Sequence, residues 1–194
     1  MIFSPQPAID WQQLFGNDRP VEIEIGCGKG AFLLAYAAQH PEVNLLGIES
    51  QPRWIRWIEE RLRASTRANA RVFCADAGMI VSRFVPDDSV RAYHVYFPDP
   101  WWKRRHHKRR LVQASFAAEL HRTLEPGGIL HLATDVADRF ASMRKELARV
   151  PFEVVIHDAP TPVGRPLTNF EGKYRAQGRP LHYATMRKAG DRAR

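Results

Sequence analysis

The sequence predicts a doubly wound α/β fold with a mostly parallel seven-stranded sheet whose last strand is antiparallel. Short apolar, β-prone runs alternate with segments of helical periodicity along most of the chain. A glycine cluster follows the first apolar run, and only a loop is expected between the last two. The length of 194 residues suits one such domain.

The first strand, helix and second strand are defined by clear breaks in composition. Residues 21–25 alternate β-branched and acidic side chains and stop at the glycines of residues 26–30. Residues 31–38 form an apolar helical segment that ends before Pro41. The apolar run 43–48 closes on a carboxylate and predicts the second strand.

Two further strand–helix units follow. Residues 52–68 repeat apolar side chains at helical spacing, and residues 71–75 form a third short strand. A brief helix at 78–84 leads to a fourth strand at 90–97. Prolines at 98 and 100 end that strand, because proline cannot continue a sheet ladder.

The last third of the chain completes the sheet. A helix at 111–124 and a Pro-Gly-Gly turn precede the fifth strand at 129–133, and a helix at 135–149 follows. Residues 152–157 and 182–186 are the final strands. Residues 159–180, which contain several prolines and glycines, are expected to form a loop that lets the last strand return antiparallel. We therefore expect a short N-terminal arm (residues 1–20) and a single domain (residues 21–194).

Charge and composition limit the possible partners and compartment. The net charge is +8 and the isoelectric point is about 9.9, a balance that favours a polyanionic partner. No apolar stretch is long enough to cross a bilayer, and the first residues lack the pattern of a secretory signal, so a cytoplasmic protein is expected. The two cysteines lack CxxC spacing, so no metal site is predicted.

Five carboxylates fall at or beside the carboxyl ends of predicted strands. They are Glu24, Glu49, Asp76, Asp99 and Asp135. In doubly wound sheets, ligands bind beyond these strand ends. One acidic strand end is common because strands must finish in water, but five in one sheet predict a ligand site.

The glycine loop favours S-adenosylmethionine over a dinucleotide. Gly26 and Gly28 belong to a GxGxG pattern rather than the GxGxxG that receives a pyrophosphate. Glu24 beside them would repel a pyrophosphate but suits a sulfonium and an ammonium group. Glu49 is placed to accept hydrogen bonds from ribose hydroxyls, and Asp76 from the adenine amino group.

A tryptophan pair and a basic run follow Asp99. The eight residues 103–110 contain only Lys, Arg and His. Beside two tryptophans this pattern is typical of an RNA surface that combines phosphate contacts with aromatic stacking. The alternative is a solvated cationic loop with both tryptophans in the core. The expected RNA-contacting residues are Arg104, Arg105, Lys108, Arg109 and Arg110.

Five short motifs stand out in the sequence: Glu24-Ile25-Gly26-Cys27-Gly28, Gly47-Ile48-Glu49, Phe97-Pro98-Asp99-Pro100-Trp101, Ala133-Thr134-Asp135 and Thr168-Asn169-Phe170-Glu171. In these motifs and their order the chain resembles the bacterial tRNA (guanine-N7-)-methyltransferases, which are class I S-adenosylmethionine-dependent enzymes of Rossmann-like fold. Trp102 departs from the family, because many members carry His or Pro there.

The resemblance implies roles for individual residues. Glu24, Gly26, Gly28, Glu49, Asp76 and Asp99 would contact S-adenosylmethionine, and Asp99 would also be the catalytic residue. Lys103, Asp135, Thr168, Asn169, Phe170 and Glu171 would bind the substrate tRNA, and the target would be the variable-loop guanosine at position 46. A monomer and a homodimer both remain open.

Chemistry restricts the role of Asp99. Guanine N7 already carries an in-plane lone pair, so methylation needs no general base there. We expect Asp99 to align the base and to stabilise its developing positive charge, while Asp135 and Glu171 hold the polar edge of the base and Lys103 binds phosphates.

Three other functions share part of this pattern. A methyltransferase for a protein or small molecule would need no basic run after Asp99. A nicotinamide-dependent oxidoreductase would share Glu49 but should show GxGxxG. A non-catalytic RNA-binding protein would fail to bind S-adenosylmethionine.

Overall fold

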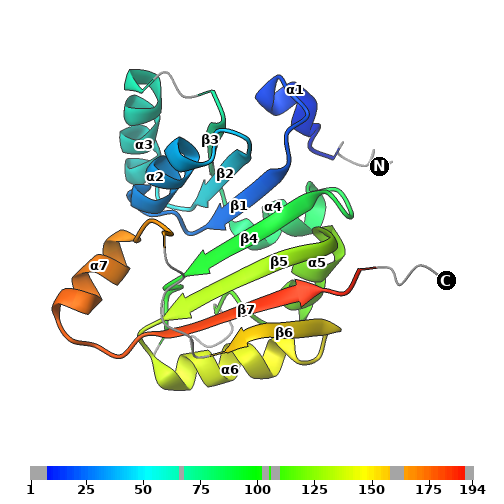
Figure 1. Cartoon of the computed structure of the whole chain (residues 1–194), viewed down its shortest axis with the longest axis vertical. Helices are drawn as coiled ribbons and strands as arrows, with labels where there is room; N and C mark the ends of the chain where they lie inside the picture. The colour runs from blue at the N-terminus through cyan, green and yellow to red at the C-terminus, as the bar shows by residue number, and fades with distance from the viewer. Residues whose placement is uncertain (1–7, 66–67, 102–104, 106–109, 158–163, 191–194) are drawn as a thin grey trace.

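The structure is a computed structural model that describes residues 8–65, 68–101, 105, 110–157 and 164–190. Seven strands form one sheet in the order β3-β2-β1-β4-β5-β7-β6, as Figure 1 shows. The pairs among β3, β2, β1, β4 and β5 are parallel, whereas β7 runs antiparallel to both β5 and β6. The predicted fold class, including the antiparallel last strand, is confirmed.

All seven strands lie where the sequence places them, with shifts at their ends. They are β1 (Val21–Ile25), β2 (Asn44–Glu49), β3 (Ala70–Cys74), β4 (Val90–Tyr96), β5 (Leu124–Thr134), β6 (Phe152–His157) and β7 (His182–Lys188). The fifth strand is longer than expected, because the Pro-Gly-Gly segment is an irregular part of the strand itself rather than a turn before it. The pairing of β4 with β5 shifts register between Val90 and Ala92.

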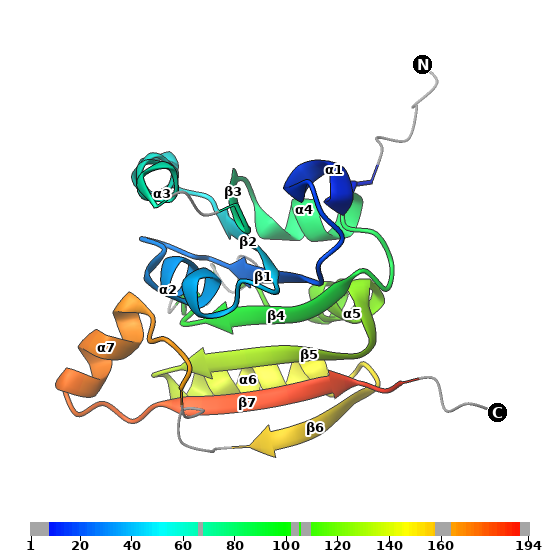
Figure 2. The same ribbon diagram turned by 45° about the horizontal axis from the view of Figure 1, so that its top comes forward.

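Helices cover both faces of the sheet. They are α1 (Trp11–Phe15), α2 (Ala31–Gln39), α3 (Pro52–Ala64), α4 (Ala77–Arg83), α5 (Ala114–Thr123), α6 (Ala137–Leu147) and α7 (Asn169–Ala176). The helices α1, α4, α5 and α6 share the larger core cluster, while α2 and α3 form a separate cluster on the opposite face. Figure 2 shows the two layers on either side of the strands.

The expectation of a plain loop at residues 159–180 is wrong, because α7 lies within it. Thr168 caps this helix by accepting a hydrogen bond from the backbone N–H of Glu171 at 3.0 Å. A threonine followed three residues later by a glutamate is the sequence signature of a capping box. The prolines and glycines in the same segment favour a loop, which is why the sequence does not predict this helix.

The described part of the N-terminal arm packs on the domain. Asp10 caps α1 through the backbone N–H of Gln13 at 2.9 Å, and Phe15 is buried in the larger core cluster. The backbone N–H of Ile9 also donates to the carbonyl of Phe84 at 2.7 Å. Residues 9–15 are therefore part of the folded body.

Candidate active site

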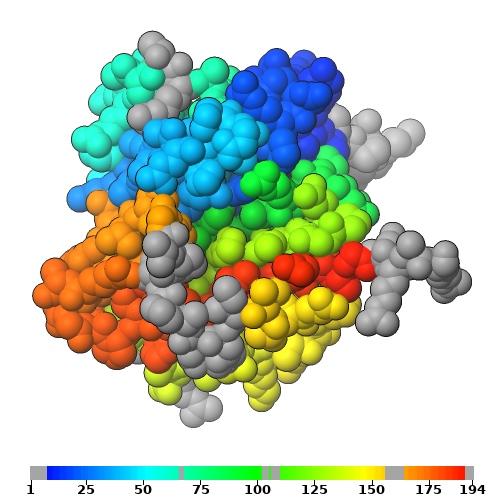
Figure 3. Space-filling model, viewed as in Figure 1, coloured from blue at the N-terminus to red at the C-terminus, as the bar shows by residue number. Residues whose placement is uncertain are grey.

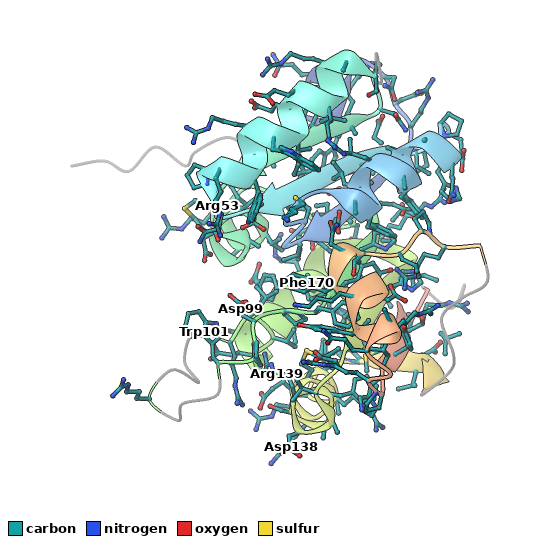
Figure 4. All side chains as sticks on the ribbon, turned by 90° about the vertical axis from the view of Figure 1, so that its left-hand side faces the viewer. Arg53, Asp99, Trp101, Asp138, Arg139 and Phe170 are labelled. Carbon is teal, nitrogen blue, oxygen red and sulfur yellow. The ribbon has the colours of Figure 1, made fainter. Side chains whose placement is uncertain are left out.

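The five predicted carboxylates lie at or just after the carboxyl ends of parallel strands. Glu24 is the penultimate residue of β1, Glu49 ends β2, and Asp76, Asp99 and Asp135 follow β3, β4 and β5. These strand ends meet at one edge of the sheet, onto which Figure 4 looks, with Asp99 labelled there. The topology thus brings all five to the edge at which such folds bind ligands.

Three glycines shape the loop between β1 and α2. Gly26, Gly28 and Gly30 have φ angles of 75°, 52° and 70°, a left-handed conformation that side chains disfavour. The backbone N–H of Gly26 donates to the carbonyl of Ile48 at 2.8 Å, which ties the loop to β2. The loop therefore presents bare backbone at the strand ends.

Glu49 closes this loop from the neighbouring strand. Its Oε2 accepts a hydrogen bond from the backbone N–H of Gly28, and its Oε1 accepts one from that of Gln51, both at 2.9 Å. These contacts hold the carboxylate beside the glycine loop. Asp76 differs, because it is exposed and its Oδ1 caps α4 through the backbone N–H of Met79 at 2.9 Å.

Glu24 is a buried carboxyl group with an unused oxygen. It is 3% exposed, and its Oε2 has no hydrogen-bond partner among the residues that the structure describes. Burial raises the pKa of Glu24 to about 8, although the backbone N–H of Leu33 and the charge of Arg165 act in the opposite direction. A buried carboxyl group of this kind fits a cationic ligand group, since an added positive charge would stabilise its ionised form.

Asp99 is exposed and lies between two strained backbone positions. Phe97 and Trp101 have φ angles of 51° and 45°, a region that large side chains rarely adopt. The backbone N–H of Phe97 donates to the carbonyl of Ala133 on β5 at 2.7 Å, which fixes the start of the segment. Such strain is typical of segments that position a functional group.

The helix α7 is attached to the strand ends by Arg165, which belongs to none of the predicted motifs. One terminal nitrogen of Arg165 donates to Oε1 and Oε2 of Glu171 at 2.9 and 2.7 Å. The same guanidinium lies 4.5 Å from the ring centroid of Tyr96 on β4 and 5.7 Å from that of Phe32 on α2. Figure 3 shows the surface of α7 and its preceding residues adjoining that of α2.

These contacts change the interpretation of Glu171. Its side chain is fully buried and binds Arg165, Arg175 and the hydroxyl of Tyr183. A carboxylate so engaged holds α7 in place instead of presenting an oxygen to a base. The role expected for Glu171 at the polar edge of guanine therefore does not fit this structure.

Four of the other predicted substrate residues lie in the described part of the chain. Asp135 pairs with Arg179 at 2.7 Å and lines a pocket of about 340 Å³ with it. Thr168 caps α7, Asn169 begins this helix, and Phe170 is half exposed on it. Phe170 is thus exposed at the surface, whereas the carboxylate of Asp135 is mostly buried and paired with Arg179.

The basic run is described only in part. Arg105 is exposed and Arg110 is partly buried beside α5. Lys103, Arg104, Lys108 and Arg109 lie outside the described residues, as does Trp102. Trp101 is partly buried, and Figure 4 shows it near Asp99.

Comparison with known proteins identifies the family. A family profile described as a putative methyltransferase matches residues 18–184. A tRNA (guanine-N(7)-)-methyltransferase of Vibrio parahaemolyticus is 41% identical over 170 residues, which cover 85% of this chain and 71% of the relative. The chain belongs to the tRNA (guanine-N(7)-)-methyltransferase family. A second family member, from Vibrio cholerae, is 42% identical over 168 residues, with 84% and 70% of the two chains covered.

Solved structures of other methyltransferases share the fold of this family member. The 16S rRNA methyltransferase KamB aligns with a TM-score of 0.69 at 16% identity, covering 92% of each chain. A SAM-dependent O-methyltransferase from Thermotoga maritima aligns with a TM-score of 0.58 at 18% identity, covering 94% of this chain and 64% of the other. At these identities the comparison shows the Rossmann-like fold.

Histidines in the sheet of this family member belong to a polar network rather than to the site. His94 on β4 contacts Glu22 at 2.8 Å and the hydroxyl of Tyr96 at 3.0 Å, and its ring stacks on that of His131. Burial and the neighbouring His94 lower the pKa of His131 to about 3.

The described residues contain neither a cluster of metal ligands nor a membrane-spanning helix. No three His, Cys, Asp or Glu side chains among them are placed to hold a metal ion. No helix in the described part of the chain is long and apolar enough to cross a bilayer.

Proposed function

We propose that the protein transfers a methyl group from S-adenosylmethionine to N7 of a guanosine in tRNA, and that the target is position 46 in the variable loop. The observation that carries the proposal is Glu24, whose buried carboxyl group with an unused oxygen adjoins the glycine loop. The relatives named tRNA (guanine-N(7)-)-methyltransferase support the choice of substrate.

Six residues would hold the cofactor. They are Glu24, Gly26, Gly28, Glu49, Asp76 and Asp99, in one domain formed by residues 21–194. When bound, S-adenosylmethionine supplies an electrophilic methyl group on a positively charged sulfur. The raised pKa of Glu24 would fall beside that charge, so its carboxylate would form as the cofactor binds.

Asp99 orients the guanine without taking a proton from N7. Its exposed carboxylate can accept hydrogen bonds from the N1 and N2 donors of the base. These bonds would fix the ring plane and favour the positive charge that develops during transfer. The strained positions at Phe97 and Trp101 support this role, because backbone strain of this kind clusters at functional sites.

The substrate-binding set extends from Asp99 toward α7 and the basic run. Asp135, Phe170 and Lys103 would contact the tRNA, as would Thr168 and Asn169 at the start of α7. Arg104, Arg105, Lys108, Arg109 and Arg110 would bind its phosphates. Glu171 acts indirectly, through the position of α7.

The direct test is product identification. Unmodified tRNA is incubated with the protein and methyl-labelled S-adenosylmethionine, then digested and separated into nucleosides. We expect the label in 7-methylguanosine alone. Label in another nucleoside, or none in the presence of bound cofactor, would contradict the proposal.

Two comparisons sharpen this test. A transcript with adenosine in place of guanosine 46 should take up no label. With the cofactor at a saturating concentration, the variant Asp99→Ala should methylate on the order of 100-fold more slowly in a single turnover. A rate within about twofold of the parent would remove Asp99 from its assigned role.

A further inference from the structure

A second pocket, of about 450 Å³, lies between α5 and α6 and has no role in the proposed methyl transfer. Arg139 on α6 lines it and is 2% exposed. All three guanidinium nitrogens of Arg139 are buried and lack a hydrogen-bond partner in the described structure. The guanidinium of an arginine carries five N–H donors, and no described residue accepts a hydrogen bond from those of Arg139.

An unpaired buried guanidinium is costly for a folded protein. Taking a charge out of water without a partner destabilises the fold, and removing it is then often neutral or stabilising. Burial and the nearby charge of Arg110 lower the pKa of Arg139 to about 10. Two arginines that repel each other in a pocket would both be stabilised by an anion between them.

The rest of the pocket wall also favours an anion. Ala114 and Ser115 in the N-terminal turn of α5 line it, and the side chain of the N-cap residue Gln113 does not cap that turn. Free N–H groups and the helix dipole make such a turn an anion site when a cation faces it. Glu146, the acidic residue in the lining, is already paired with Arg149 at 3.5 Å.

The pocket includes residues from the first turns of α5 and α6. The helices α5 and α6 begin after β4 and β5, so their N-termini share the sheet edge of Asp99. Figure 4 shows Asp99, Trp101 and Arg139 at that edge, and Arg110 in the pocket wall ends the basic run. A phosphate bound by Arg110 would therefore lie at the pocket.

We propose that this pocket binds one phosphate of the tRNA backbone, with the guanidinium of Arg139 donating to its oxygens. The inference rests on tRNA being the substrate. A planar guanidinium offers paired donors to phosphate oxygens, and the first turn of α5 supplies the remaining hydrogen bonds. The phosphate thereby fixes the register of the RNA relative to Asp99.

The first experiment measures phosphate binding to the pocket in the absence of tRNA. Thermal unfolding of the parent and of Arg139→Met is followed with increasing inorganic phosphate, the ionic strength being held constant with chloride. We expect phosphate to raise the Tm of the parent by a few degrees and to leave Arg139→Met unchanged. Without phosphate the variant should be at least as stable as the parent.

Two results of this experiment would overturn the site. A variant that unfolds or loses much stability without phosphate would mean that Arg139 is satisfied inside the fold. An equal rise in Tm for both proteins would mean that phosphate binds elsewhere. Because this experiment uses no RNA, it stands even if the protein methylates another substrate.

The second experiment tests the assignment to tRNA. Arg139→Met should raise the KM for tRNA on the order of tenfold, leave cofactor binding unchanged, and reduce the slope of log affinity against log salt by about one. Lys145→Met, which removes an exposed charge from the same helix outside the pocket, is the matched control. Arg139→Lys should lie between parent and Arg139→Met, since one charge remains without the paired donors.

The two experiments together separate the sources of the anion. Arg139→Met could lose phosphate binding in the first experiment yet keep the parental tRNA affinity and salt slope in the second. The pocket would then bind a small free anion, and the proposed tRNA contact would be overturned. If the protein methylates no tRNA but Arg139→Met still weakens tRNA binding, the pocket stands while the proposed function falls.

Discussion

Arg165 and Glu171 form a buried ion pair in which a single guanidinium nitrogen serves both carboxylate oxygens. The two side chains are 8% and 0% exposed. The hydroxyl of Tyr183 donates to the same carboxylate at 2.7 Å, so the pair joins α7 to β7. The position of α7 over the site therefore depends on a contact formed by three separate parts of the chain.

The first prediction concerns this pair. Arg165→Met should lower the free energy of unfolding by about 3 kcal/mol, because it leaves Glu171 buried with too little positive charge beside it. Arg175→Met is the matched control: Arg175 contacts the same carboxylate at 3.2 Å but is 43% exposed, so its loss should cost under about 1 kcal/mol. Urea denaturation measures both, and equal losses would argue against a special role for Arg165.

The sheet could be predicted from the sequence because the signals for its strands are local in the sequence. Short apolar strands, glycine breaks and helical periodicity each lie within a few residues, and parallel strand ends then place Glu24, Glu49 and Asp99 at one edge. Their place at the ends of predicted strands was therefore enough to predict that these three carboxylates lie at one edge.

The parts that could not be predicted depend on side-chain contacts that no sequence motif indicates. Arg165 is close to Glu171 in the sequence, but no motif shows that the two pair or that Arg165 lies over the distant Tyr96. Arg139 occurs in an ordinary amphipathic helix, and only the packed structure shows that its guanidinium is buried. The start of α7 differs, because threonine at 168 followed by glutamate at 171 is a local sequence signal for a helix N-terminus.

The second prediction is a pH dependence caused by Glu24. Its pKa in the folded protein is about 8, above the value of 4.5 for an ordinary glutamate, so the folded state binds an extra proton between these pH values. Stability must then fall as the pH rises through this window. In Glu24→Gln this fall should be absent, so its stability relative to the parent should increase by on the order of 2–4 kcal/mol from pH 5 to pH 8.5.

Chemical denaturation at the two pH values tests this expectation. Glu60→Gln, at an exposed position on α3, is the control and should follow the parent at both. The same Glu24→Gln variant should bind S-adenosylmethionine at least about tenfold more weakly, since the charge that faces the cation is gone. A variant with parental affinity and a parental pH profile would contradict both statements.

The third prediction concerns the close packing behind the glycine loop. A Cβ on Gly47 would lie 2.5 Å from Cδ1 of Leu33, 3.0 Å from Sγ of Cys27 and 3.2 Å from Cγ1 of Val72. Gly47→Ala should therefore cost about 1–3 kcal/mol of stability. The double variant with Leu33→Val should lose less than the sum of the single losses, because the nearest methyl group is removed.

Gly172→Ala provides the control for this substitution. Gly172 lies in α7, and a Cβ at this position would meet no atom of the described residues within 4 Å, so alanine should stabilise the helix by about 0.5–1 kcal/mol. Thermal and urea unfolding distinguish the two glycines. If Gly47→Ala were as harmless as Gly172→Ala, the loop would not be packed as described.

The fourth prediction concerns Phe170, which is 50% exposed on α7, with its ring centroid 5.9 Å from that of Tyr174. A half-exposed aromatic ring contributes little to folding, but it offers a surface on which an RNA base can stack, worth about 1–3 kcal/mol. Phe170→Ala should then raise the KM for tRNA about tenfold while stability and cofactor affinity stay near the parent. Leu167→Ala, which removes a similarly exposed apolar side chain before α7, should change the KM little. Steady-state kinetics measures both variants, and an equal change in KM would mean that apolar surface in general, rather than ring stacking, accounts for the effect.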